Sequence, residues 1–182
     1  MYPPLDLARF ALSEFERGLS DLSDQEARIR IGKADGTEMN AISWVVGHIA
    51  QHWLSIASSV TGERRPGGLR PSAEGLRPFS SGPNADPTPP PLADTIALLT
   101  AAAESVEWIG NADAERLSSK PESNPEAESL GTTVMRAALH TWYHLGEIAA
   151  VRQMMGHVEV PFVGGMAGKL EWGSAQEGRE TP

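Results

Sequence analysis

Cysteine is absent from the 182 residues of this chain. Its absence excludes disulfide bonds, zinc sites built from thiolates, and a thiol nucleophile supplied by the protein itself. Histidine, aspartate and glutamate are the side chains that remain as metal ligands. Any chemistry that needs a thiolate would therefore have to take it from a second molecule.

Positive charge is also scarce in this sequence. The formal net charge is −9, and no basic cluster extends beyond Arg64–Arg65. The phosphate backbone of a nucleic acid would be repelled on average, so we expect no nucleic-acid partner.

Long apolar runs are missing as well. No stretch of the chain approaches the ~20 apolar residues that span a bilayer, and the opening "MYPPLDLARF" lacks the charged and apolar regions of a secretory signal. We therefore expect a cytoplasmic protein with no membrane partner. Its length favours one domain with a sizeable core.

Apolar residues recur at steps of three and four, the spacing that places them on one face of a helix. This spacing predicts four long helices, from Leu5 to about Leu19, over about 40–60, from 92 to near 110, and over about 132–155. A capping box formed by Ser23 and Glu26 predicts a short helical turn after the first of them. No strand-like alternation of useful length is present, so the sequence predicts an all-α four-helix bundle.

The same spacing predicts which side chains are buried. The buried faces are expected to carry Leu5, Ala8, Leu12, Phe15 and Leu19 in the first helix, Trp44, Val45, His48, Ile49, His52 and Ile56 in the second, and Leu92, Ile96, Leu99, Ala103 and Val106 in the third. The solvent faces are expected to carry Arg9, Glu14, Glu16 and Arg17 in the first helix, and Arg152 and Gln153 in the last.

Proline is concentrated in one connection. Eight of the 14 prolines lie in residues 62–91, where missing donors and fixed φ angles exclude a regular element. We expect a long loop between the second and third helices, and loops of this length are often functional, for example as one wall of a pocket. The Gly-rich residues 162–182 are expected to form a tail, which leaves residues 1–161 as the helical domain.

Three of the five histidines fall in "HTWYHLGEIAAVRQMMGH", residues 140–157. At ~100° per residue, His144 lies about 40° from His140 and Glu147 about 20° to the other side, so all three share one stripe of the helix. Val151 and Met154 continue that stripe, which identifies it as the inward face.

A buried imidazole needs partners for its nitrogens, and two explanations satisfy that need. Each histidine could be a hydrogen-bonded core residue, or several could bind one divalent metal through neutral nitrogens. The His-x-x-x-His pair alone leaves both open, and His48 on a second inner face favours the metal. His52 taken alone is more typical of a hydrogen-bonded core residue.

Two stretches resemble a known family. "HTWYHLGEIAAVRQMMG" is similar to the fourth helix of the DinB/YfiT-like superfamily, and "ISWVVGHIAQHW" to its second. The resemblance implies a four-helix bundle, often a homodimer, that holds a divalent metal with three histidines. Matched residue by residue, these ligands are His48, His140 and His144. His52 has no counterpart and stays open as a fourth ligand or as a neighbour of the ligands.

Two further residues have alternative interpretations. Glu147 is the candidate catalytic residue, as a general base, but it could also orient a ligand or reach solvent at the edge of the bundle. His157 follows Gly156 at the end of the last helix, where capping the helix dipole is expected rather than catalysis.

Three histidine ligands leave an open position on the ion, as in catalytic sites. The family resemblance implies a metal-dependent enzyme acting on a small molecule, with a thiol-dependent S-transferase as the first expectation. The alternatives are a metal-dependent hydrolase, a stress-related binding protein without turnover, and a structural bundle without metal. Zinc or nickel is expected, although imidazole ligands also suit iron and copper.

A homodimer is expected as well. The second helix carries Ile42, Trp53 and Leu54 away from its histidine stripe. Apolar residues of this kind often mark an interface when they lie on the surface.

Overall fold

The computed structural model describes residues 3–62, 88–121, 124, 126–159 and 164–170. Across these residues the regular structure is helical, apart from an isolated bridge between Gly32 and Glu38. The all-α prediction is confirmed over the described part of the chain. The helices are α1 (Pro3–Gly18), α2 (Asp24–Ala27), α3 (Ile42–Thr61), α4 (Leu92–Ile109), α5 (Ala114–Ser118) and α6 (Leu130–Met154).

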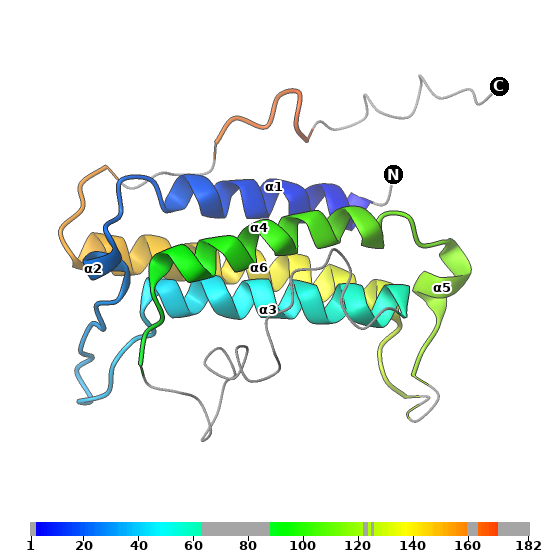
Figure 1. Ribbon diagram of the computed structural model, residues 1–182, viewed down its shortest axis with the longest axis horizontal. Coiled ribbons are helices and arrows are strands. Elements are labelled where there is room, and N and C mark those ends of the chain that lie inside the picture. The colour runs from blue at the N-terminus through cyan, green and yellow to red at the C-terminus, as the bar shows by residue number, and fades with distance from the viewer. Residues whose placement is uncertain (1–2, 63–87, 122–123, 125, 160–163, 171–182) are drawn as a thin grey trace.

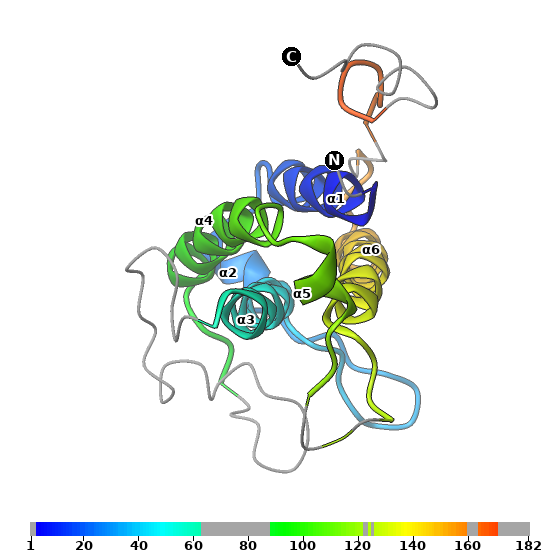
Figure 2. The same ribbon diagram turned by 90° about the vertical axis from the view of Figure 1, so that its right-hand side faces the viewer.

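The four long helices α1, α3, α4 and α6 lie side by side around one core (Figures 1 and 2). Helix α3 packs against α4 and α6, and α1 packs against the same two helices from the other side. Figure 1 shows that α1 and α6 run in one direction and that α3 and α4 run in the other. Helix α6 is therefore antiparallel to α3, the neighbour with which it shares the histidines.

The parallel arrangement of α3 and α4 places the end of α3 and the start of α4 at opposite ends of the molecule. A 20-residue helix such as α3 is ~30 Å long, so a short turn cannot join them. This accounts for a connection as long as residues 62–91. The Pro-rich loop predicted there falls mostly on residues 63–87, outside the described residues.

The helix ends follow their local sequence. The predicted capping box is present at α2, where the Ser23 hydroxyl accepts from the Glu26 amide and the Glu26 side chain accepts from the Ser23 amide. Helix α3 ends at Gly62, which adopts a left-handed φ of 73° that favours glycine. Ser129 caps the start of α6 by accepting from the amide of Thr132.

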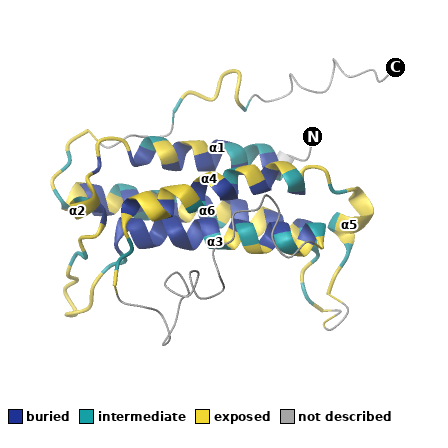
Figure 3. Cartoon of the chain, viewed as in Figure 1, coloured by how far each residue is buried: buried dark blue, intermediate teal, exposed yellow. Residues whose placement is uncertain are grey.

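Buried residues are concentrated on the four long helices, whereas the described connecting segments are largely exposed (Figure 3). The predicted stripe of α1 is fully confirmed, because all five of its members are buried. Ile42 and Trp53 of α3 are completely buried, and the Trp53 indole donates to the Thr141 hydroxyl of α6 at 2.9 Å. The expectation that these two residues form a surface patch is wrong, because α3 uses them inside the core.

Two charged residues assigned to solvent are buried instead. The Glu14 carboxylate is only 2% exposed and accepts hydrogen bonds from the Arg17 guanidinium and the Gly164 amide. Arg152, 4% exposed, donates to the Gly18 carbonyl of α1 and to Nδ1 of His157. Each charge is buried because a partner outside its own helical turn satisfies it, which helical spacing does not reveal.

Other residues lie farther out than the spacing predicts. Ile96 is 41% exposed, because the buried face of α4 contains Thr95, Leu99 and Ala102 and Ile96 lies beside this face. Met154 is half exposed at the last turn of α6, where the core ends. His52 is also exposed, at the edge of the contact between α3 and α6.

None of the described helices combines the length and the apolar character needed to cross a membrane.

Candidate metal centre

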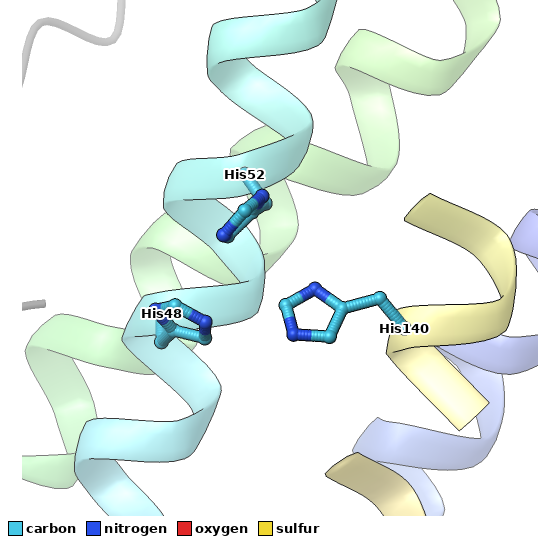
Figure 4. Close-up of side chains that lie close together, drawn as sticks. All are labelled: His48, His52 and His140. Atoms are coloured by element: carbon cyan, nitrogen blue, oxygen red, sulfur yellow. The ribbon is translucent and has the colours of Figure 1, made fainter. Parts of the chain in front are cut away.

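Four histidines come together where α3 and α6 pack against each other. His48 and His52 lie on consecutive turns of α3, and His140 reaches toward them from α6 (Figure 4). His144 lies one turn after His140 on α6. The i, i+4 spacing within each helix puts both members of a pair on the same side, so two antiparallel helices bring four imidazoles to one place.

The four rings form one continuous cluster. The His48 ring centroid lies 4.7 Å from that of His52, 5.3 Å from that of His140 and 5.2 Å from that of His144. His140 is 4.5 Å from His144 and 4.8 Å from His52. Ring nitrogens of His48, His52 and His140 lie within 4.8 Å of one another, which makes these three a group able to hold a metal ion. The structure thus brings together the three predicted ligands and adds His52.

Two ring nitrogens from α6 lie within hydrogen-bond distance of each other. Nε2 of His140 lies 2.9 Å from Nε2 of His144. Two nitrogens bound to one ion at about 2.1 Å each are at most about 4.2 Å apart, so this separation is compatible with a shared cation. Without a cation, one of these nitrogens carries a hydrogen and donates a hydrogen bond to the other.

Glu147 sets the tautomer of His144. Its Oε2 lies 2.6 Å from His144 Nδ1, and its Oε1 accepts from the side-chain amide of Asn40 at 3.3 Å. A carboxylate can only accept in this contact, so Nδ1 carries the hydrogen and the lone pair of a neutral His144 lies at Nε2. That lone pair faces His140. The hydrogen bond with His144 also lowers the pKa of Glu147, which keeps it ionised at neutral pH.

Burial and neighbouring groups keep His52 and His140 neutral at pH 7. Burial of the ring and the neighbouring His144 lower the pKa of His140 to about 4. The part of the His52 ring that faces the cluster is shielded from water, and this shielding together with His48 lowers the pKa of His52 to about 4. The positive charge of Arg136 acts in the same direction on both. Neutral imidazoles keep the lone pair that a metal ligand requires.

The cluster has a closed side and an open side. His48 and His144 are each only 7% exposed, and the indole of Trp44 stacks on His48 with centroids 4.8 Å apart. On the open side, a pocket of about 740 Å³ is lined by His48, His52 and His140 together with residues from both helices. His144 and Glu147 are not among the described residues that line it, so they support the site from behind.

The remaining predicted site residues have clear positions. Glu147 lies in the cluster as a partner of His144. His157 lies apart from it, where its Nδ1 accepts from Arg152 and its Nε2 lies 3.3 Å from Glu26. Helical spacing gave no sign of Asn40, which precedes α3. It also gave no role to Arg136, although its position one turn before His140 was a usable signal.

The donor set fits a divalent metal. It consists of ring nitrogens of His48, His52 and His140 that lie within 4.8 Å of one another. His144 lies beside them, with Nε2 2.9 Å from His140 and Nδ1 oriented by the Glu147 carboxylate, and this carboxylate–histidine arrangement recurs around metal ions in proteins.

Comparisons with known proteins agree with this geometry. A family model described as "DinB superfamily" matches residues 7–148, a range that includes all four histidines of the cluster and Glu147. Neither a search of curated proteins nor a search of solved structures gave a match.

Proposed function

Because the chain belongs to the DinB superfamily, we propose that it is a metal-dependent enzyme with the four-helix bundle of DinB/YfiT-like proteins. His48, His140 and His144 would hold one divalent ion, zinc or nickel. The observation that carries this proposal is the 2.9 Å approach of the His140 and His144 Nε2 atoms, with Glu147 directing the lone pair of His144 toward His140.

His52 takes a different place in the proposal. It belongs to the group of close ring nitrogens, but it is exposed and lines the pocket, whereas His48 and His144 are buried. This position suits a residue that meets the substrate or adds a fourth ligand from the open side.

The chain itself would bind and orient the reacting molecules and would keep water out of the site. A divalent ion on neutral imidazoles supplies a Lewis acid that favours the anionic form of a water or thiol beside it. Glu147 would hold the proton at His144 Nδ1. Since both of its oxygens are engaged, by His144 and Asn40, its contacts support the orienting role over that of a general base. With no cysteine in the chain, a sulfur nucleophile would come from a small thiol bound in the pocket.

Metal content tests the site. Wild type purified with zinc or nickel and then desalted is expected to retain about one ion per chain, because three imidazoles bind a divalent ion tightly. His140→Ala and His144→Ala should lose it, and His52→Ala should keep most of it. His157→Ala is the matched control, since that histidine lies outside the cluster. Equal, sub-stoichiometric metal in wild type and His144→Ala would refute the site.

Turnover separates the competing functions. We expect metal-loaded protein to join a small thiol to a chlorinated or maleyl-type electrophile, and His140→Ala to be inactive. Hydrolysis of esters or amides without a thiol would instead indicate the hydrolase alternative. Full metal occupancy without turnover in either assay would favour the stress-related binding protein.

The homodimer is also part of this proposal. Its support now comes from exposed apolar side chains on α6, namely Met135, Leu139 and Tyr143, and no longer from Ile42 and Trp53. Light scattering that gives the 19.5 kDa mass of one chain at high protein concentration would rule the dimer out.

A further inference from the structure

The pocket beside the histidines extends along the groove between α3 and α6. On the α6 side it is lined by Thr133, Arg136, Ala137 and His140, which recur at steps of three, one and three and therefore share one helix face. Arg136 precedes His140 by one turn, a rise of ~6 Å along the helix axis. A molecule whose reacting end meets the histidines would have its other end beside this arginine.

Arg136 is the only lysine or arginine among the described residues that line the pocket. It stands out because the chain as a whole carries a net charge of −9. A guanidinium presents planar N–H donors that match a carboxylate. The pocket therefore offers one fixed positive charge on an otherwise acidic molecule.

The structure already shows a carboxylate on this guanidinium. Nε of Arg136 donates to Oε2 of Glu128 at 2.9 Å, and Glu128 also lines the pocket. The two side chains are 66% and 44% exposed. An ion pair this exposed contributes little to stability, so another carboxylate can replace Glu128 at small cost.

Apolar side chains form much of the pocket wall. Ala137 lies between Arg136 and His140 on α6, and Ile56, Leu130, Leu139 and Tyr143 also line the pocket. Such a wall suits a short hydrocarbon segment between the reacting group and the charged group.

We propose that the pocket binds a small carboxylate-bearing molecule whose carboxylate displaces Glu128 from Arg136 while its other end lies at His48, His52 and His140. Arg136 is thus a specificity-determining residue. The placement of the reacting end rests on the proposed function, whereas the recognition of the carboxylate rests on Arg136 and the pocket alone.

A pair of thiols that differ only in charge tests this proposal. Cobalt(II)-loaded protein is titrated with 4-mercaptobutyrate and with its neutral methyl ester, and the visible spectrum of cobalt reports the binding of the sulfur. The acid should bind about two- to fivefold more tightly than the ester, the range that an exposed charge pair supplies. Arg136→Gln should reduce this ratio to about one, and Glu128→Gln should strengthen binding of the acid only.

The control is Lys33→Gln, which removes one positive charge from an exposed turn far from the pocket in the sequence. It should keep the preference for the acid, because the effect is local. Arg136 is exposed, so its substitution is not expected to disturb folding. Equal affinity of wild type for acid and ester, or an unchanged preference in Arg136→Gln, would overturn the proposal.

A second measurement works without metal. The Nε–H resonance of Arg136, identified by its loss in Arg136→Gln, is followed by NMR as metal-free protein is titrated with butyrate or with butyramide. Butyrate should shift this resonance and butyramide should not. A resonance that responds to neither compound, or equally to both compounds, would contradict the proposal. If neither thiol changes the cobalt spectrum, the metal-dependent function fails, and this NMR result still decides the role of Arg136.

Discussion

At the scale of single residues, Glu147 couples the metal centre to a segment outside the helices. Its carboxylate accepts from His144 on one oxygen and from Asn40, just before α3, on the other. The hydrogen on His144 Nδ1 stays in place only while this acceptor remains. The residue that holds the tautomer is therefore expected to contribute to the affinity of the proposed metal site, although it is not among the described residues that line the pocket.

Replacing Glu147 with Gln is expected to weaken zinc or nickel binding by about 10- to 100-fold, the usual effect of losing a partner of a ligating histidine. The amide is neutral and can turn an N–H toward Nδ1, which would favour the wrong tautomer. Competition with a chromophoric chelator measures the affinity. Glu115→Gln, on exposed α5, is the control and should bind metal as wild type does. An unchanged affinity in Glu147→Gln would show that the carboxylate does not orient His144.

Residue spacing predicted part of the centre and missed the rest for physical reasons. His48, His140, His144 and Glu147 lie on regular helices, where an angle of 100° per residue fixes which side chains share a face. Asn40 lies outside a helix, so no such angle applies to it. How deeply a face is buried also depends on the neighbouring helix, and for this reason the prediction that His52 is buried is wrong.

At the scale of elements, the helices themselves were well predicted. The spacing of apolar residues and the capping residues predicted both ends of α1, α3 and α6 to within about two residues, the usual uncertainty of helix boundaries. The errors concern which side chains are buried, and they include the charged residues Glu14 and Arg152. Both are buried by partners distant in the sequence, Gly164 and Gly18, which no local pattern contains.

The Glu14 contact gives α1 a pH-dependent stability. The hydrogen bond from Arg17, followed by that from the Gly164 amide, holds the pKa of Glu14 below its ordinary value of 4.5. A lowered pKa means that the folded state favours the ionised form. The resulting stability is fully present above the unfolded pKa and is lost as pH falls through the folded one.

Glu14→Gln should therefore be less stable than wild type at pH 7, by about 1–3 kcal/mol for a charged group bonded in a buried position. The difference should shrink as the pH falls below about 4.5, because wild-type Glu14 then becomes neutral as well. Urea unfolding at several pH values measures it. Glu16→Gln, exposed on the same helix, is the control. A gap that stays constant with pH would contradict the assignment.

At the scale of the whole molecule, the proposed metal ligands come from helices far apart in the sequence. His48 and His140 meet only when α3 and α6 are packed together. An unfolded chain does not present this arrangement. Binding of an ion by these histidines, as we propose, would therefore be linked to folding of the whole helical domain.

Zinc or nickel at about 100 times its dissociation constant should raise the melting temperature by roughly 5–10 °C, since this excess adds about 2.7 kcal/mol to a domain of this size. Calorimetry with and without the metal measures the shift, and a chelator should reverse it. His144→Ala should melt at the same temperature in both conditions. A wild-type melting temperature that is the same with and without the metal would argue against a metal site in the folded protein.

Helix α6 is held differently at its two ends. Near its C-terminus, buried Arg152 connects it to the carbonyl of Gly18 and, through His157, to Glu26 in α2. Its first turns instead border the pocket, with Thr132, Met135 and Arg136 exposed. In terms of hydrogen exchange, the amides near Ile148 should open only with global unfolding, whereas those near Arg136 should exchange by local fraying. A ligand held at Arg136 would then slow exchange in these first turns, so binding would order the less stable half of the helix that carries the histidines.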